Sequence, residues 1–556
     1  MLLAMGSEKR GGTTMLPGSL RRSVWWFLMI LAAVGAARVD AQCGGGSSIG
    51  QYGCWEQQIE SSKDFYNGGA GNPYRDLTLR VTFTGPGTGT GGTSFTQDAF
   101  WVGDTTNATT AKRFKVRAAL RPGIWTWSIA GCTGTTGNQS CSTGTTWTPS
   151  SGAIMVYARA LPNALLSRGF PTQSSSGTVY QPLTYGDRVT RFYWAGDTAW
   201  SAPAFEIDAL LHGGARYWSN FLAARTPDSQ FWPPPPYNHY AASAVLVAPA
   251  AHWNKANAAD VFKVQPGCPL TPAMGSNAYN NVLWYPNNCS IPNPAYWDAL
   301  DTMVQSATNS DIVLLIAGLI HPLNLGSTYP TYPPPAEVAR FSRYLAARMA
   351  GFAVMFSPGF DMPVTALAAD GTSNGRMLMD SSGTAVRAAS PKALVTAHLN
   401  GSALCSDYRS FATSPSPWMT WYLFQSGHAL ASQGQSSDPC AGWQGLAQET
   451  RVQGALRRAI NLPATLAGYS SPTMPSINAE GPYDNPANSS TDYTLVDVRY
   501  RVRQAGNLSS LSGAQGFTYG MTPVSLWSNP SAIGTRPSET DMHALATRFR
   551  PYPGLA

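Results

Sequence analysis

Eight short apolar segments alternate with helix-like stretches after about residue 185, and each segment has the length and composition of a buried strand. The segments are 191–196, 243–250, 311–318, 351–358, 393–398, 418–424, 475–480 and 516–520, and helical patterns between them include 336–349, 442–460 and 494–506. Eight such strand–helix units predict a (β/α)8 TIM barrel. A doubly wound sheet is the main alternative, but no glycine-rich phosphate loop follows an early strand.

The chain before the barrel has a different pattern. From about 43 to 180, short alternating segments rich in β-formers are separated by Gly, Thr and Ser, for example at 77–85, 99–103, 112–120 and 124–131. Turn signals at such spacing predict an immunoglobulin-like β-sandwich. We therefore expect an all-β domain over 42–182 followed by the α/β barrel over 183–556. Packing against the barrel is the plainer role for the sandwich, and sugar binding is the other.

The first 41 residues have the features of a signal peptide. Arg21 and Arg22 precede the apolar run 24–37, and Val39 and Ala41 fit a small-residue cleavage site. The run is short for a membrane span, although an uncleaved anchor stays an alternative. No second apolar run of spanning length follows, so we expect a secreted mature chain without a membrane span.

Cysteine and charge usage agree with export. The eight cysteines fall into four couples that are close in sequence: Cys43 with Cys54, Cys132 with Cys141, Cys268 with Cys289, and Cys405 with Cys440. An even count in an exported chain predicts disulfides, although the sequence does not fix their connectivity. Six N-x-S/T sites, at Asn107, Asn138, Asn288, Asn400, Asn488 and Asn507, predict a glycoprotein. The net charge is +7, but Lys and Arg are scattered, which argues against a nucleic-acid partner.

Polar and aromatic residues gather just after the predicted barrel strands, where barrel enzymes place their chemistry. They are Asp197, Trp200, His252, Trp253, His321, Asp361, His398, Asn400, Gln425, His428, Glu480, Tyr483 and Tyr519. Taken one at a time, each His is more simply interpreted as a buried structural residue, and each Asp as a residue that caps a helix. Only 12% of the residues are charged, however, and four of the seven His lie in this set. The clustering therefore predicts a functional site at one rim.

Asp361 and Glu480 are the candidate catalytic pair. Glycoside hydrolysis needs one carboxyl group to protonate the leaving oxygen and a second to attack the anomeric carbon or to activate water. Trp and Tyr rings stack on sugar faces, which suits an oligosaccharide or polysaccharide as the partner. We expect no cofactor and no metal: the four His lack an HExxH spacing, so a metal hydrolase is a weaker alternative. A serine hydrolase is weaker still, because no G-x-S-x-G follows a strand.

At these residues the sequence resembles a known family. The runs YWAGDTAW, SPGFD, VTAH, FQSGH, NAEGPYD and AQGFTYG occur in the order found in the apiosidase-like catalytic domain of glycoside hydrolases. The segments CWE, NPY, FTGP and RPGIWTW resemble the β-sandwich that often precedes that domain. The resemblance implies that Asp361 is the general acid/base and Glu480 the nucleophile. The implied substrate-binding candidates are Asp197, His398, Gln425, His428, Tyr483 and Tyr519, to which the stacking argument adds Trp200 and Trp253.

The sequence departs from this family in three places. Gly359-Phe360-Asp361 stands where relatives usually have Gly-Gly-Asp, the loops after the first and second strands are longer than in relatives, and we expect no counterpart of the carboxy-terminal β domain common in relatives. The substrate therefore does not transfer. The sequence as a whole predicts a secreted, retaining glycoside hydrolase acting on a cell-wall or extracellular polysaccharide. A non-catalytic glycan-binding protein is the alternative from another class, and an adhesion protein that uses the sandwich is a weaker one.

Overall fold

The computed structural model of the 556-residue chain contains two compact units, Met1–Gln42 and Cys43–Ala556. It describes residues 43–65, 72–87, 93–105, 110–134, 144–173, 182–226, 242–248, 262–263, 291–317, 335–359, 374–398, 418–425, 474–481, 483–484, 495–511, 514–525, 527–530, 541–542 and 545. All of these belong to the second unit, so the predicted signal peptide lies outside the described residues. None of the helices within these ranges is both long and apolar enough to cross a membrane.

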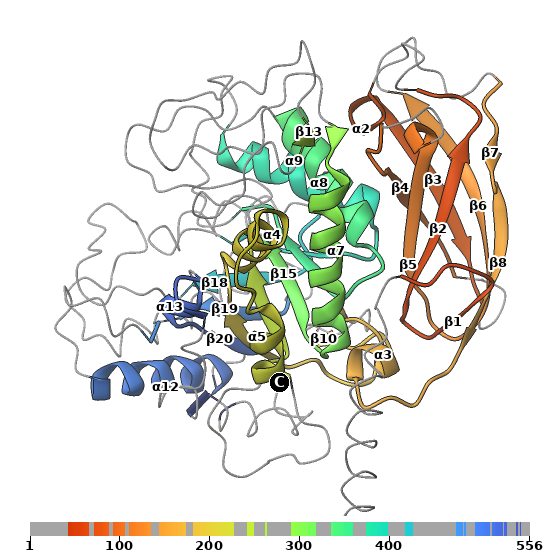
Figure 1. The fold of residues 1–556 in the computed structure, drawn as a ribbon. Helices are drawn as coiled ribbons and strands as arrows, with labels where there is room; N and C mark the ends of the chain where they lie inside the picture. The colour runs from red at the N-terminus through yellow and green to blue at the C-terminus, as the bar shows by residue number, and fades with distance from the viewer. Residues whose placement is uncertain are drawn as a thin grey trace, which may run out of the picture. The chain divides into compact units, whose positions relative to one another are not determined.

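The amino-terminal part of the second unit is a sheet of eight strands (Figure 1). The strands are β1 (Ser48–Gly50), β2 (Cys54–Ser61), β3 (Leu77–Thr84), β4 (Ser94–Trp101), β5 (Arg113–Ala119), β6 (Gly123–Gly134), β7 (Trp147–Thr148) and β8 (Ser151–Tyr157). They follow the order β1-β8-β6-β3-β4-β5-β2-β7, and all pairs except β1 with β8 are antiparallel. The strands predicted at 77–85, 112–120 and 124–131 are present.

This sheet folds over so that its two halves face each other. Strand β4 pairs with β3 on one side and with β5 on the other, which carries the sheet from one half to the next. The ring of Trp55 on β2 lies 5.8 Å from that of Phe83 on β3 and 5.9 Å from that of Trp127 on β6. These aromatic contacts between halves form the core of the region. The immunoglobulin-like assignment stays a prediction.

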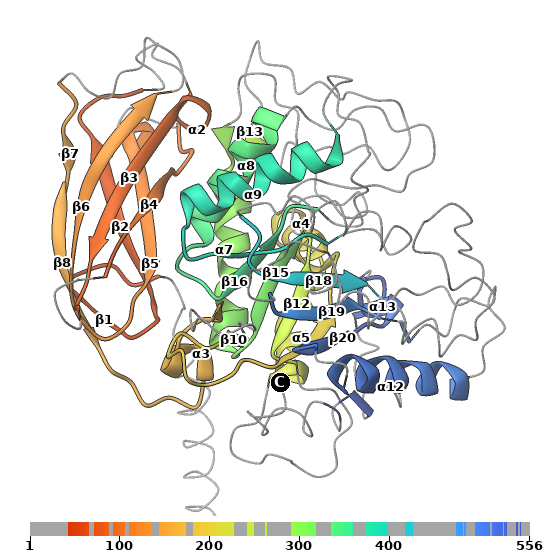
Figure 2. The same cartoon turned by 180° about the vertical axis from the view of Figure 1, so that it is seen from behind.

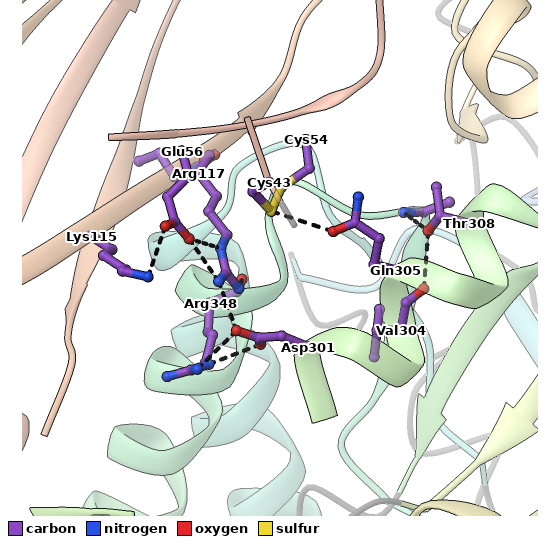
Figure 3. Close-up of a disulfide and its surroundings, with 12 residues drawn as sticks. Cys43, Cys54, Glu56, Lys115, Arg117, Asp301, Val304, Gln305, Thr308 and Arg348 are labelled. Carbon is purple, nitrogen blue, oxygen red and sulfur yellow. Dashed lines mark hydrogen bonds and ion pairs between the residues drawn. A yellow bond between two sulfur atoms is a disulfide. The ribbon is translucent and has the colours of Figure 1, made fainter. Parts of the chain in front are cut away.

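The cysteines of this region are oxidised. Cys43 and Cys54 form a disulfide, as one of the predicted couples requires (Figure 3). Cys132 is also disulfide-bonded. Its predicted partner Cys141, together with Cys268, Cys289, Cys405 and Cys440, lies outside the described residues.

The second sheet is TIM-barrel-like, and all eight of its strands are parallel to their neighbours. The strands are β11 (Trp194–Thr198), β12 (Ala244–Val247), β15 (Val313–Ala317), β16 (Val354–Ser357), β17 (Leu394–Val395), β18 (Tyr422–Gln425), β19 (Ser476–Glu480) and β20 (Gly516–Tyr519). Their order is β17-β16-β15-β12-β11-β20-β19-β18, and a parallel bridge from His398 to Leu423 joins the two end strands. Each strand matches one of the eight predicted segments.

Side chains alternate between two cores along these strands, as the pleat requires. Trp194, Leu246, Leu315, Trp421 and Ile477 belong to a core made largely by the strands themselves, inside the curved sheet. Intervening residues of the same strands pack with the helices in the larger core. Buried apolar residues on both faces explain why the strands read as continuous apolar runs in the sequence.

Helices cover the outside of the parallel sheet (Figures 1 and 2). The longer ones are α4 (Ala202–His212), α5 (Trp218–Arg225), α7 (Pro294–Asn309), α8 (Pro335–Met349), α9 (Gly375–Ala389) and α12 (Leu495–Leu511). Short elements are α2 (Pro73–Asp76), α3 (Ala164–Arg168), α13 (Thr522–Ser525), a 3-10 turn at Thr110–Lys112, and the strand pairs β9 (Thr172–Gln173) with β10 (Leu183–Thr184) and β13 (Phe262–Lys263) with β14 (Ile291–Pro292). Helices α8 and α12 were predicted, whereas 442–460 lies outside the described residues.

A buried cluster of charged side chains connects the amino-terminal sheet to two helices of the barrel (Figure 3). Arg117 of β5 reaches Asp301 of α7, with 2.7 Å between Nη2 and Oδ2, and Nη1 donates to the carbonyl of Arg348 on α8. Arg348 binds the same carboxylate through Nε at 2.9 Å and Nη2 at 2.8 Å. Glu56 of β2 accepts from Arg117 Nε at 2.8 Å. One carboxylate therefore ties a strand of the amino-terminal sheet to two barrel helices.

Candidate active site

The structure describes six of the ten residues predicted for the site with their side chains: Asp197, Trp200, His398, Glu480, Tyr483 and Tyr519. Gln425 is described as the last residue of β18, without its side chain. Asp361, Trp253 and His428 lie outside the described residues, as do His252, His321 and Asn400. The site is therefore built from the ends of β11, β17, β19 and β20.

Glu480, the last residue of β19, carries the central carboxylate. It is buried, with 4% of its surface exposed. Oε2 of Glu480 lies 3.2 Å from Nε2 of His398, which follows β17 and is fully buried. The pairing register shifts between Phe424 and Gln425, directly opposite Glu480. Such irregularities re-aim a side chain. Here Asn478, two residues earlier, bonds outward to Ser509 of α12, while Glu480 meets His398.

Tyr483 connects this carboxylate to the end of β11. Its hydroxyl hydrogen-bonds with Glu480 and accepts a hydrogen bond of 2.7 Å from Nε1 of Trp200. The Trp200 ring meets the His398 ring edge-on, with centroids 5.3 Å apart at 90°. Four predicted residues from three strand ends therefore form one contact group, and each of them touches at least two of the others.

The electrostatics of this group favour a neutral phenol. Burial raises the pKa of Tyr483 well above its usual range, and the negative charge of Glu480 raises it further. A protonated hydroxyl can donate to the carboxylate while it accepts from Trp200. The neutral Tyr483 hydroxyl therefore stabilises the ionised carboxylate of Glu480 through a hydrogen bond.

Asp197 has a different environment. It is 1% exposed, and its Oδ2 accepts a 2.5 Å charged hydrogen bond from Nε of Arg225 on α5. Its Oδ1 accepts from the amide of Thr198 at 2.7 Å. Asp197 alternates with Trp194 and Gly196 along β11, so it faces the helices. Its carboxylate holds β11 to α5, and the substrate contact expected for it stays a prediction.

Tyr519 at the end of β20 is fully buried and donates its hydroxyl to Oδ2 of Asp484 at 3.3 Å. The amide of Asp484 donates to the carbonyl of Gly520 at 2.8 Å, and a parallel bridge joins Asp484 to Met521. These bonds fix the turn that carries Tyr483. Tyr519 pairs in register with Asp197 and packs in the larger core with the helices, so the substrate contact expected for it stays a prediction.

Sequence reasoning missed three residues that position the group. Arg225 and Asp484 are the partners of Asp197 and Tyr519. Asp484 ends the NAEGPYD motif but was not singled out there, whereas Arg225 lies on a helix outside the strand-end motifs. Ser357 ends β16: its hydroxyl donates to the carbonyl of Gly359 at 2.6 Å and accepts from the amide of His398 at 2.8 Å. Ser357 thus ties the strand that precedes Asp361 to the residue beside Glu480.

A buried carboxylate with a fixed imidazole and phenol, at the carboxyl ends of parallel barrel strands, can act as a nucleophile or as a base. The described residues contain no group of three or more His, Cys, Asp or Glu side chains placed to hold a metal ion. This fold and arrangement suit a barrel enzyme that works with carboxyl groups, as glycoside hydrolases do.

Comparisons with known proteins also indicate a glycoside hydrolase. The family model described as the apiosidase-like catalytic domain matches residues 260–545, and the chain belongs to this family. A solved structure described as a proposed glycoside hydrolase from Bacteroides vulgatus is 14% identical, with a TM-score of 0.50, over 86% of this chain and 72% of that one.

Two further solved structures are similar. One, described as a glycoside hydrolase, is 16% identical with a TM-score of 0.46 over 68% of this chain and 74% of its own. The other, a family 5 glycoside hydrolase from Bacteroides vulgatus, is 18% identical with a TM-score of 0.40 over 65% and 64%. No curated protein matches the chain.

Proposed function

We propose that this glycoside hydrolase is secreted and cleaves a cell-wall or extracellular polysaccharide with retention of configuration, using Glu480 as nucleophile and Asp361 as general acid/base. The observation that carries the proposal is the buried carboxylate of Glu480 at the end of β19, held by His398 and Tyr483. The family membership supports the reaction class.

The reaction would proceed in two displacements. Asp361 donates its proton to the glycosidic oxygen while a Glu480 oxygen attacks the anomeric carbon. The bond from that carbon to the leaving sugar breaks, and an ester links the remaining sugar to Glu480. Asp361 then removes a proton from water, the water oxygen attacks the same carbon, and the ester bond breaks to regenerate Glu480.

The contacts of Glu480 suit the nucleophile rather than the acid. A nucleophile must be ionised, and hydrogen bonds to the charged form favour that state. The Tyr483 hydroxyl supplies such a bond, and His398 lies within ion-pair distance. Asp361 stands four residues after the end of β16, in the sequence position where the acid/base follows the fourth barrel strand.

Two features support secretion. The Cys43–Cys54 disulfide begins one residue after Gln42, the first residue of the expected mature chain, and Cys132 is also oxidised. Disulfides persist in oxidising compartments. The expected immunoglobulin-like sandwich over 42–182 is part of the same proposal. Amino-terminal sequencing of protein recovered from the growth medium tests export; the expected first residue is Gln42.

The activity is tested by incubating the purified chain with plant and algal cell-wall polysaccharides and identifying released sugars by mass spectrometry. Glu480→Gln should reduce release at least about 100-fold while the fold is kept. Asp298→Asn, an exposed carboxylate on α7, is the matched control. NMR of the first product should show the anomer of the substrate. Release of the opposite anomer, or a Glu480→Gln rate within tenfold of wild type, would refute the nucleophile assignment.

A further inference from the structure

A second cavity lies at the other end of the barrel from Glu480. Its volume is about 660 Å³, and its walls include Val354 and Leu394, at which β16 and β17 begin, and Thr420, two residues before β18. The opposite wall comes from the amino-terminal sheet, with Arg121 and Trp125. The cavity is therefore built by both regions of the chain and is separate from the candidate active site.

Its lining is strongly basic. Arg121, Arg188, Arg387 and Lys392 line it, against the single carboxylate of Asp187. Asp187 is already held by the amides of Val189 and Thr190, at 2.9 Å each, and by Arg168 at 3.5 Å. Within the part of the chain that the structure describes, none of the four cations has a carboxylate oxygen within 4.0 Å. The excess positive charge is thus uncompensated by the described residues.

The cations are also close enough to repel one another. Nζ of Lys392 lies 3.5 Å from the centroid of the Phe95 ring and 5.5 Å from that of Trp125. Desolvation by the surrounding protein and, after it, the charges of Arg121 and Arg188 together lower the pKa of Lys392 to about 8. Nε of Arg121 is buried without a hydrogen-bond partner among the described residues. An anion in the cavity would relieve this repulsion and satisfy that donor.

Size and shape restrict the ligand. A cavity of this volume is within the range of small-molecule sites and exceeds what one inorganic anion fills. Aromatic rings line it beside the cations: Trp125, and the pair Tyr52 and Phe170, whose centroids are 6.4 Å apart. Rings beside cationic side chains suit a cyclic ligand with an apolar face and an anionic substituent.

We propose that this cavity binds an anionic saccharide, whose sugar ring packs on the aromatic wall and whose carboxylate or sulfate group lies among Arg121, Arg188 and Lys392. The choice of a saccharide rests on the proposed function, whereas the preference for an anion rests on the cavity alone. The site would hold a charged branch or a neighbouring chain of the substrate while Glu480 acts elsewhere.

Binding is measured by isothermal titration calorimetry on full-length Glu480→Gln protein, so that the ligand is not consumed. The probes are an oligogalacturonate, a sulfated oligosaccharide and a neutral oligosaccharide of equal length, and inorganic phosphate. At least one anionic saccharide should bind about tenfold or more tightly than the neutral one, because hydrogen bonds between charged groups are stronger than those between neutral groups. The carboxylated and sulfated probes distinguish the two sources of charge.

Variants locate the site. Arg188→Gln and Lys392→Gln should each weaken binding of the anionic saccharide about tenfold. Arg80→Gln, at an exposed arginine outside the cavity, should leave it unchanged. Equal binding of charged and neutral probes, equal binding of phosphate, or insensitivity to both cavity variants would overturn the proposal. A wild-type chain that binds the anion here but hydrolyses nothing would refute the proposed function and leave this site intact.

Discussion

Gly520 lies against the ring of Tyr483: a Cβ atom at position 520 would come within 2.2 Å of Cε1 and 2.4 Å of Cδ1. The glycine follows β20, and its carbonyl accepts from the amide of Asp484. The absence of a side chain at 520 is therefore what allows the phenol to reach Glu480 and Trp200.

We expect Gly520→Ala to lower the rate of hydrolysis by about 100-fold, because a displacement of about 1 Å in a site can have that effect. The Tyr483 ring cannot stay in place once a methyl group occupies its contact surface. Gly131→Ala is the matched control, since a Cβ there meets no atom within 4 Å. Steady-state kinetics of both variants checks this, and a Gly520→Ala rate equal to that of Gly131→Ala would contradict it.

Tyr483→Phe tests the phenol alone. The substitution keeps the ring but leaves Nε1 of Trp200 without its acceptor and removes a donor to Glu480. A lost hydrogen bond to a charged group is worth about 1.5–3 kcal/mol, so kcat should fall about tenfold or more. Tyr157→Phe, at an exposed tyrosine on β8, should have wild-type kinetics. If both variants have the same kcat, the hydroxyl has no part in the reaction.

We predict that the ion cluster around Asp301 stabilises the folded protein. Burial alone would raise the pKa of Asp301, but Arg117 and Arg348 outweigh it, and the pKa is lowered. Asp301→Asn leaves two buried guanidinium groups without their shared anion and should lower the free energy of unfolding by about 3–5 kcal/mol at pH 7. Asp298→Asn removes an exposed partner of Arg348 and should lower it by less than about 1 kcal/mol.

The pH dependence of this difference has a definite sign. A carboxylate whose pKa is lowered by folding contributes its full stability above its unfolded pKa and loses it as the pH falls through the folded value. The gap between wild type and Asp301→Asn should therefore be constant near neutrality and shrink below about pH 4. Urea unfolding at several pH values measures it; a gap that widens in acid would show that the ion cluster is not its cause.

Because of Lys392, we expect proton uptake when an anion binds in the second cavity. Its folded pKa of about 8 means that the side chain is partly neutral above that pH. A bound anion favours the charged form, so binding near pH 8 should take up protons and weaken as the pH rises further. The other charged groups that line the cavity are Arg121, Arg188, Arg387 and Asp187. Calorimetry in buffers of different ionisation enthalpy measures the uptake, which Lys392→Gln should abolish.

The strands of the barrel could be predicted because each is buried on both faces and reads as an apolar run. The helices were harder to predict. Helix α9 contains Gly383 and two serines inside its span, where the ring of Trp418 packs against the glycine, and such tertiary contacts leave no periodic signal. Helix α5 has eight residues and too little amphipathic pattern to stand out.

The position of Glu480 at a strand end could be predicted because Asp, Glu and His residues cluster at the ends of apolar strands in a chain with few charges. The directions in which the neighbouring side chains point could not be predicted. Adjacent residues of a strand face opposite sides of the sheet, and the sequence does not show which side each one takes. Asp197 therefore meets Arg225 on the helical side although it ends a strand of the same rim. The partners Arg225 and Asp484 depend on packing between segments far apart in sequence.

Arg117 comes from the amino-terminal sheet, and it pairs both with Glu56 of that sheet and with Asp301 of a barrel helix. A barrel expressed without that sheet would expose the Asp301 carboxylate and the surrounding apolar contact surface, and would be expected to misfold or aggregate. The two regions are thus expected to fold as one piece, and replacement of the amino-terminal sheet should succeed only where the new sheet supplies an arginine to Asp301.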